Sequence, residues 1–270
     1  MSTPALPLSG RTALVTGVSR RQGIGFAVAR RLAAAGAQLA VQHWAPHDAR
    51  QPWGADDPAA VVELLRDALT PGARLFDVSL DLADPAAPDR LVAEAEAALG
   101  PLDVLVANQA RSGGDGRLAE IDAADLDAHW AVNARATLLL TRAFAARHDD
   151  TRPGGRVIWF TSGQGLGPMS DEIAYATSKA ALAGITPSIA ADLAPRGILL
   201  NTVNPGPVDT GYLAPATTDR PDRLEALLSA FPAGRYGEPD DPARLVAWLV
   251  SDDGCWVVGQ VIDSEGGFRR

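Results

Sequence analysis

Short runs of β-branched and leucine residues alternate along the chain with longer segments in which apolar residues recur every three or four positions. One short run, residues 102–107 (LDVLVA), is almost wholly apolar, as in a parallel strand covered on both faces. The pattern predicts strands at residues 12–16, 38–43, 73–80, 102–107, 156–161, 198–203 and 257–263. It predicts helices at residues 23–35, 58–69, 85–99, 122–147, 173–193, 221–231 and 239–250.

This alternation of strand and helix runs from one end of the chain to the other. It predicts an α/β protein with a doubly wound Rossmann fold, a seven-stranded parallel sheet flanked by helices. No linker, repeat or low-complexity block interrupts it, so we expect a single domain over residues 1–270. The least regular stretches, residues 45–57 and 205–220, are of a length that is often functional in a compact fold.

Composition narrows the function classes. The 270 residues carry 24 Lys plus Arg against 33 Asp plus Glu, a net charge of −9, which argues against nucleic acid or an anionic membrane as a partner. The hydrophobic fraction of 47% excludes a disordered chain. With a single cysteine, Cys255, and four histidines that lack ligand spacing, we expect neither disulfides nor a metal. The first ten residues lack the pattern of a secretory leader and no apolar run is long enough to span a membrane, so we expect no leader and a soluble, cytoplasmic protein.

The first predicted strand runs into a glycine-rich turn, residues 16–25 (TGVSRRQGIG), which a helix follows. Glycines allow a tight turn and a close backbone approach to a pyrophosphate, and the N–H groups of the helix N-terminus then face the anion. The turn therefore indicates a dinucleotide site, with a purely structural turn as the alternative reading.

The second predicted strand bears on the choice of cofactor. Dinucleotide sites for NAD place an acid at its end, but here it ends at His43 and Trp44, with no acid until Asp48. Arg20 and Arg21, in the glycine turn, could pair with a 2′-phosphate, and simple solvation of both arginines is the alternative. We therefore expect NADP in preference to NAD.

One tyrosine and one lysine are four residues apart in a predicted helix, Tyr175 and Lys179, which places both on one face. A cation close to a phenol lowers the phenol's pKa toward values useful for proton exchange with a carbonyl or an alcohol. The spacing alone is common. Its weight comes from composition, because Lys179 is the only lysine in a chain that otherwise uses arginine for every basic position.

Together these motifs resemble those of the short-chain dehydrogenase/reductase family, over nearly the whole chain, and most closely its single-domain members such as 3-oxoacyl-carrier-protein reductases. Further matches fall in the family's order and spacing. They are Asp81-Leu82, Ala107-Asn108-Gln109-Ala110, Asn133, Ser162 located 13 residues before Tyr175, and residues 204–210 (NPGPVDT).

The resemblance implies a role for each matching residue. Tyr175 is implied to be the general acid and base, and Lys179 to lower its pKa and hold the nicotinamide ribose. Ser162 is implied to polarise the substrate oxygen, and Asn133 to anchor a water that connects Lys179 to solvent. Thr210 and the backbone near it are implied to hold the carboxamide.

The glycine turn and the resemblance imply cofactor contacts at Gly17, Ser19, Arg20, Arg21, Gly23, Ile24, Gly25, His43, Asp81, Leu82, Asn108, Tyr175, Lys179, Pro205, Gly206, Val208 and Thr210. Substrate contacts are expected from Ser162, Gln164, Met169 and Tyr212, with a mobile substrate loop at about residues 205–235. The resemblance implies a homotetramer or a homodimer.

The chain departs from the family pattern in two places. Its glycine turn is two residues longer than the usual Thr-Gly-x-x-x-Gly-x-Gly, within residues 19–22. Enoyl-carrier-protein reductases also have a longer turn, but their tyrosine and lysine are further apart. The second departure is Gln109-Ala110-Arg111 in place of Ala-Gly, where side chains could narrow the pocket mouth or reach the substrate.

The resulting hypothesis is an NADP(H)-dependent enzyme that interconverts a ketone and a secondary alcohol, with 3-oxoacyl thioesters among its candidate substrates. The alternatives are a non-catalytic nucleotide sensor on the same fold, an NAD-dependent or enoyl-reductase-like member, and a dehydration or epimerisation at the same site. The four residues Asn133, Ser162, Tyr175 and Lys179 argue against a sensor, which needs no proton relay.

Overall fold

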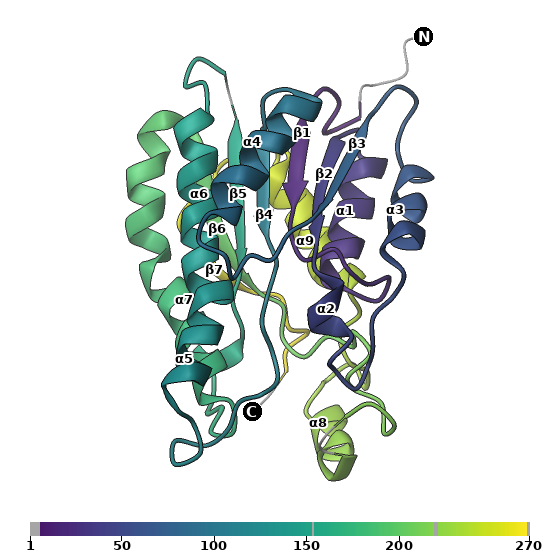
Figure 1. Ribbon diagram of the computed structural model, residues 1–270, viewed down its shortest axis with the longest axis vertical. Coiled ribbons are helices and arrows are strands. Elements are labelled where there is room, and N and C mark those ends of the chain that lie inside the picture. Colours follow the sequence, from purple (N-terminus) through teal and green to yellow (C-terminus); the bar gives the residue numbers. More distant parts are fainter. Residues whose placement is uncertain (1–5, 153, 219–220, 269–270) are drawn as a thin grey trace.

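A computed structural model describes residues 6–152, 154–218 and 221–268. One sheet of seven parallel strands lies at its centre, in the order β3-β2-β1-β4-β5-β6-β7 (Figure 1). The strands are β1 Thr12–Val15, β2 Gln38–His43, β3 Leu75–Ser79, β4 Val104–Ala107, β5 Gly155–Phe160, β6 Ile198–Asn204 and β7 Val261–Asp263. The predicted fold class is therefore confirmed. That the whole chain forms a single domain stays a prediction.

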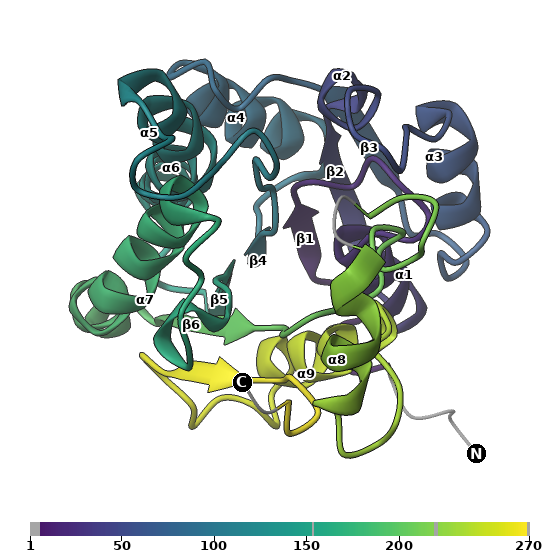
Figure 2. The ribbon, with the colours of Figure 1, turned by 90° about the horizontal axis from the view of Figure 1, so that it is seen from below.

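Helices cover both faces of the sheet, as Figure 2 shows. One face carries α1 Ile24–Ala34, α3 Pro58–Arg66 and α9 Asp240–Val250, and the other carries α4 Ala87–Leu99, α6 Ala136–Arg147 and α7 Ile173–Leu193. Short helices α2 Ala45–Asp48 and α8 Leu224–Ser229 lie at the end of the molecule where the strands finish (Figure 1).

Successive strand residues alternate between two hydrophobic clusters, one on each side of the sheet. Val15 and Val41 pack with Leu32 of α1, whereas Leu14 and Trp159 belong to the cluster on the opposite side. Because both faces are covered, β4 (VLVA) is apolar and buried at every position, as the run 102–107 predicts. The strand order reverses between β1 and β4, and ligands of such sheets bind at the carboxyl ends beside that reversal.

Several predicted elements have different boundaries. The predicted helix at residues 122–147 is three segments: α5 Ala123–His129, a π-helical turn Trp130–Arg135, and α6. The predicted strand at 257–263 begins only at Val261; Gly259 has a φ of +70°, outside the extended region, although its N–H still donates to Leu200 of β6. Residues 45–57 begin with α2 and so are not wholly irregular. The predicted helix 221–231 begins with a 3₁₀ turn, Pro221–Arg223. Residues 219 and 220 of the predicted substrate loop lie outside the described ranges.

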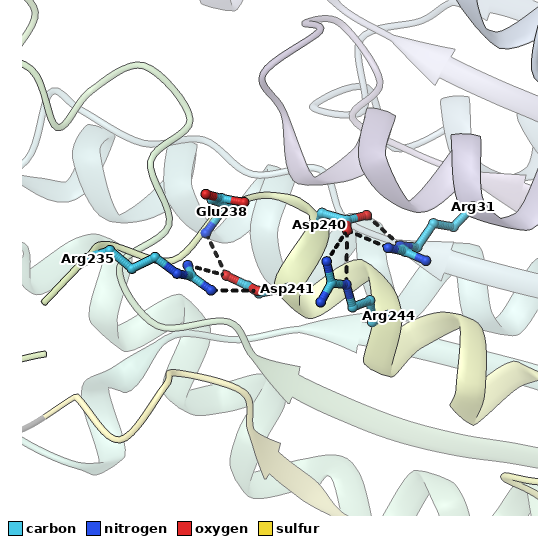
Figure 3. A network of polar contacts seen from close by, with 6 residues as sticks. All are labelled: Arg31, Arg235, Glu238, Asp240, Asp241 and Arg244. Carbon is cyan, nitrogen blue, oxygen red and sulfur yellow. Dashed lines mark hydrogen bonds and ion pairs between the residues drawn. The ribbon is translucent and has the colours of Figure 1, made fainter. Parts of the chain in front are cut away.

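Ion pairs join the first long helix to the last (Figure 3). Asp240, at the start of α9, binds Arg31 of α1 and Arg244 one turn further along α9. Asp241 accepts hydrogen bonds from Arg235 and from the backbone N–H of Glu238, which fixes the chain entering α9. The end of the loop after β6 is therefore anchored to α9, which is itself joined to α1. In the described ranges, no helix combines the length and the apolar character needed to cross a bilayer.

Candidate active site

The glycine turn is packed tightly against the end of β4. Gly17 has a φ of +69°, and a Cβ there would lie 2.9 Å from both Asn108 Nδ2 and Gln109 Cα. A Cβ on Gly25 would lie 2.5 Å from the Gly17 carbonyl oxygen and 2.6 Å from Asn108 Nδ2. Asn108 Nδ2 itself donates to the carbonyl oxygens of Thr16 and Gly17, at 3.2 Å each. Both glycines are therefore required by the path of the backbone.

The turn leaves the N-terminus of α1 suited to an anion. Gly23 is the N-cap, no side chain caps the helix, and its first turn carries no acid. The first backbone N–H groups of an 11-residue helix, from Ile24 onward, thus lack competing side-chain acceptors. This cradle fits the pyrophosphate of a dinucleotide.

The two arginines of the turn already have carboxylate partners. Arg20 Nε lies 3.0 Å from Asp48 Oδ1, and Ser19 Oγ donates to Asp48 Oδ2. Arg21 Nη2 lies 2.9 Å from Asp56 Oδ1, on a side chain that is 58% exposed. The structure thus divides the predicted pair: Arg20 is largely buried and Arg21 remains at the surface. The alternative that both are simply solvated is wrong.

Of the three residues predicted near the adenosine, His43 and Leu82 are buried and Asp81 is half-buried. His43 is buried, with Nε2 3.7 Å from Asp77 Oδ2. Leu82 is also buried and packs in the cluster on the α4 side of the sheet. Asp81 accepts the backbone N–H of Ala83 at 2.9 Å, which fixes the turn after β3. Their contacts with a cofactor stay a prediction.

The prediction that Gln109 lines the pocket mouth or reaches the substrate is wrong. Its side chain is buried, accepts a hydrogen bond from Thr16 Oγ1 and donates to Thr137 Oγ1 at 2.9 Å. It therefore joins the end of β1 to α6 from the position where the family usually has an alanine. Arg111 differs, since its backbone N–H donates to Asn133 Oδ1 at 2.7 Å and its side chain is half-buried.

Asn133 lies in the π-helical turn, where an extra residue in the turn directs it into the site. It is fully buried, and its Nδ2 donates to the Arg111 carbonyl oxygen at 3.1 Å and to Ser178 Oγ at 2.9 Å. Ser178 in turn donates to the carbonyl oxygen of Tyr175. Asn133 therefore connects the loop after β4 to the helix that carries Tyr175 and Lys179. The water relay expected at Asn133 stays a prediction.

Ser162, Tyr175 and Lys179 meet where β5 ends and α7 begins. Lys179 Nζ lies 5.7 Å from the centroid of the Tyr175 ring and donates to the Phe160 carbonyl oxygen at 2.9 Å. Burial raises the pKa of Tyr175 to about 12, the charge of Glu172 adds to the rise, and a hydrogen bond with Ser162 opposes it. Burial also lowers the pKa of Lys179 to about 8. Burial is thus the largest influence on the pKa of the phenol, and the lowering of that pKa by Lys179 stays a prediction.

An acid that the sequence did not single out holds the start of α7. Asp115, in the loop after β4, accepts the backbone N–H groups of Ala174 at 3.0 Å and Tyr175 at 2.7 Å. Next to it, Ile173 donates its backbone N–H to the Gly116 carbonyl oxygen at 3.2 Å. The only available signal is a lone acid in a glycine-rich loop (GGDG), which does not indicate its partner.

The segment after β6 is fixed at its base. Val208 is buried and forms a bridge with Gly237, and the Asp209 N–H donates to the Gly237 carbonyl oxygen at 2.8 Å. Gly206 has a φ of +67°, and a Cβ there would lie 2.4 Å from Glu265 Cβ. Pro205 and Gly206 are both half-buried beside this base.

The residues expected to touch substrate lie on two segments. Gln164 and Met169 follow β5 and are half-buried, and Gln164 Nε2 donates to Thr161 Oγ1 at 3.1 Å. Tyr212 follows β6, and its ring packs edge-on against Trp53 at a centroid distance of 6.2 Å. Gln164 and Tyr212 therefore have structural partners, and contact with a substrate stays a prediction for all three.

Comparison with known proteins agrees with this fold. A family model described as enoyl-(acyl carrier protein) reductase matches residues 17–269. The chain is 39% identical to the uncharacterized oxidoreductase YjdA of Bacillus subtilis over 96% of this chain and 97% of that protein. A short-chain dehydrogenase/reductase from Serratia marcescens superposes with a TM-score of 0.80 and 33% identity, over 97% of this chain and 99% of that one. A blue fluorescent protein from a metagenomic library, solved in complex with NADPH, superposes with a TM-score of 0.81 and 36% identity, over 98% and 100%.

Proposed function

The chain belongs to the short-chain dehydrogenase/reductase family and is an oxidoreductase, and on that premise we propose that it interconverts a ketone and a secondary alcohol with NADP(H). The observation that carries the proposal is the meeting of Ser162, Tyr175 and Lys179 at the carboxyl edge of the sheet, the edge at which the uncapped N-terminus of α1 also lies.

Tyr175 is the proposed proton donor and acceptor. The phenol is protonated near neutral pH and can donate its proton to a carbonyl oxygen, although burial raises its pKa to about 12 and so weakens it as an acid. Ser162, hydrogen-bonded to the same phenol, orients and polarises that oxygen. In the direction of alcohol oxidation, the ammonium of Lys179 favours the phenolate that accepts the proton. A bound nicotinamide supplies the hydride that no side chain can provide.

Gly17, Gly23, Ile24 and Gly25 are the proposed cradle of the pyrophosphate, and Thr210 is the proposed holder of the carboxamide. For the 2′-phosphate that distinguishes NADP we favour Arg21, whose guanidinium is exposed and has only Asp56 beside it among the ion pairs of the described residues. Two observations support NADP as the cofactor: the metagenomic relative was solved in complex with NADPH, and β2 has no acid at its end.

The test is a panel of ketones, 3-oxoacyl thioesters and aldehydes, followed by NADPH absorbance, with Tyr175→Phe as the matched variant. We expect turnover that falls at least ~100-fold in Tyr175→Phe, while NADPH binding measured by calorimetry is nearly unchanged. Retained turnover in that variant would exclude the proposed proton transfer. Arg21→Ala should raise the KM for NADPH much more than the KM for NADH.

Two alternatives give different results in the same panel. A non-catalytic nucleotide sensor would bind NADPH and reduce nothing. The matching family model is described as an enoyl reductase, and an enzyme of that kind would reduce an enoyl thioester and leave ketones unreduced. The four-residue spacing of Tyr175 and Lys179 favours carbonyl reduction.

The expected assembly is a homotetramer or a homodimer acting in the cytoplasm on a small carbonyl or alcohol. Exposed tryptophans support an assembly, because Trp256 is 95% exposed and Trp130 and Trp248 are each 44% exposed. Light scattering on a size-exclusion column tests the oligomeric state.

A further inference from the structure

Three segments that are distant in sequence meet beside the carboxyl end of β1. They are the glycine turn, residues 16–25, the segment after β2, residues 44–57, and a stretch after β6, residues 209–217, which we call the lid segment. Figure 1 places α2, of the second segment, and α8, which follows the lid segment, at the same end of the molecule. Arg20 contacts both of the other segments.

The Arg20 guanidinium has three partners. Nε pairs with Asp48 at 3.0 Å, Nη1 donates to the Thr210 carbonyl oxygen, and the group lies 5.4 Å from the centroid of the Trp53 ring. Trp53 also packs against Tyr212 of the lid segment. We call these five residues, Arg20, Asp48, Trp53, Thr210 and Tyr212, the Arg20 clasp.

The ion pair of the clasp is almost out of solvent, with side chains 14% exposed for Arg20 and 9% for Asp48. Ser19 satisfies the second carboxylate oxygen of Asp48. A planar guanidinium can bind a carboxylate and a carbonyl oxygen and stack on an aromatic ring at once, which an ammonium cannot. The site therefore requires arginine, and the positive charge of Arg20 is already paired with Asp48.

The lid segment approaches the clasp through its backbone. Gly211 has a φ of +100°, and a Cβ there would lie 3.2 Å from Gln22 Oε1 and 3.5 Å from Arg20 Nη1. Within the segment, the N–H of Gly211 donates to Asp209 Oδ1 at 2.9 Å, and the N–H of Thr217 donates to the Ala214 carbonyl oxygen at 3.0 Å. The lid segment is thus held at its base by Gly237 and on its side by Arg20.

We propose that Arg20 is a positioning residue that holds the lid segment against the glycine turn and α2, and that it thereby retains the cofactor instead of binding its 2′-phosphate. The extra length of the glycine turn serves to carry Arg20 across to Thr210. The retention of NADPH rests on the proposed function, whereas the ordering of the lid segment does not.

The first experiment measures backbone hydrogen exchange by mass spectrometry without added cofactor. Arg20→Ala should raise exchange at least ~10-fold in peptides covering residues 48–54 and 209–217, since a hydrogen bond to a charged group is worth about that factor. Arg90→Ala, which breaks an exposed ion pair with Glu94 on α4, is the control and should leave these peptides unchanged. Wild-type exchange in Arg20→Ala overturns the clasp.

If Arg20→Ala fails to fold because Asp48 is left as an unpaired buried charge, the double variant Arg20→Ala/Asp48→Ala removes both charges. It should show the same local increase in exchange. An unchanged lid segment in the double variant also overturns the proposal.

The second experiment measures the release of NADPH by stopped-flow, following its own fluorescence after mixing with an excess of a non-fluorescent competing nucleotide. Arg20→Ala should raise the dissociation rates of NADPH and of NADH by about the same factor, roughly 10-fold over the wild type. Faster release of NADPH alone would identify Arg20 as a 2′-phosphate ligand and overturn the proposal, as would unchanged release of both. A wild-type protein that binds neither cofactor refutes the proposed function, and the exchange experiment still decides the clasp.

Discussion

The carboxylate of Asp115 accepts the backbone N–H of Tyr175 at 2.7 Å, across 60 positions of the sequence. The same carboxylate accepts the N–H groups of Ala174 and of Gly116. The first turn of α7, which carries the proposed proton donor, is therefore capped by the loop after β4. A negative charge at a helix N-terminus also interacts favourably with the helix dipole.

Asp115→Ala should lower kcat by roughly 10- to 100-fold, because a small displacement of Tyr175 misaligns the phenol with the substrate oxygen. Steady-state kinetics should show kcat falling while the KM for NADPH stays within about twofold of the wild-type value. Asp115→Asn, which keeps one acceptor oxygen, should be intermediate. Glu120→Ala is the control from the same loop, since Glu120 caps only the N–H of Arg117. A parallel loss of kcat in the control would argue against a specific effect on Tyr175.

Lys179→Arg should fold normally yet lose most activity. Lys179 is buried, and a guanidinium is larger, planar and permanently charged, so it cannot reproduce the ammonium that donates to Phe160. We expect kcat to fall by about 100-fold, with circular dichroism and the thermal midpoint close to wild type. Arg90→Lys, the reverse exchange at an exposed site, should keep full activity. Wild-type rates in Lys179→Arg would mean that charge alone suffices.

The pKa of Lys179 can be measured directly, because a chain with one lysine gives one signal after ¹³Cε-lysine labelling. Burial lowers this pKa to about 8 from the ordinary 10.5, so we expect a titration midpoint near 8. Between these two values the unfolded chain binds more protons than the folded protein, and the Lys179 contribution to stability rises with pH. Below pH 8 both states are protonated, and the contribution no longer changes.

Urea unfolding of the wild type and of Lys179→Met at about pH 7 and about pH 9.5 tests this sign. The stability of the wild type relative to the variant should increase toward the higher pH. A midpoint near 10.5 in the labelled protein, or a relative stability independent of pH, would contradict the burial of a charged Lys179.

Gly25→Ala should weaken NADPH binding by at least ~10-fold, although alanine favours a helix more than glycine does. The added Cβ would meet the Gly17 carbonyl oxygen and Asn108 Nδ2, so the cradle must shift. Fluorescence titration with NADPH measures the effect. Gly184→Ala, in α7, is the control: apart from the helix's own nearby backbone, no described atom lies within 4 Å of its Cβ, and it should leave binding unchanged while stabilising the fold by up to about 1 kcal/mol.

The local sequence decides most elements of this fold. The boundaries of α7 agree with its predicted range, and the strands agree within a few residues, because side-chain periodicity follows directly from burial on one or both faces. The π-helical turn at Asn133 was not predicted, since its residues continue the apolar spacing of an ordinary helix. The family motifs could likewise be found by order and spacing alone.

Contacts between distant segments were decided only by the tertiary structure. Sequence patterns place Arg20 and Gln109 near the site without identifying their partners, and they do not single out Asp115. The order of the strands brings Asp48 and Thr210 to Arg20, turns Gln109 inward toward Thr16, and sets Asp115 against α7. The physical reason is that a charged or amide side chain takes whichever partner the packed chain brings within hydrogen-bonding distance. One residue's neighbours in sequence determine its backbone conformation, whereas the whole fold determines which charges it meets.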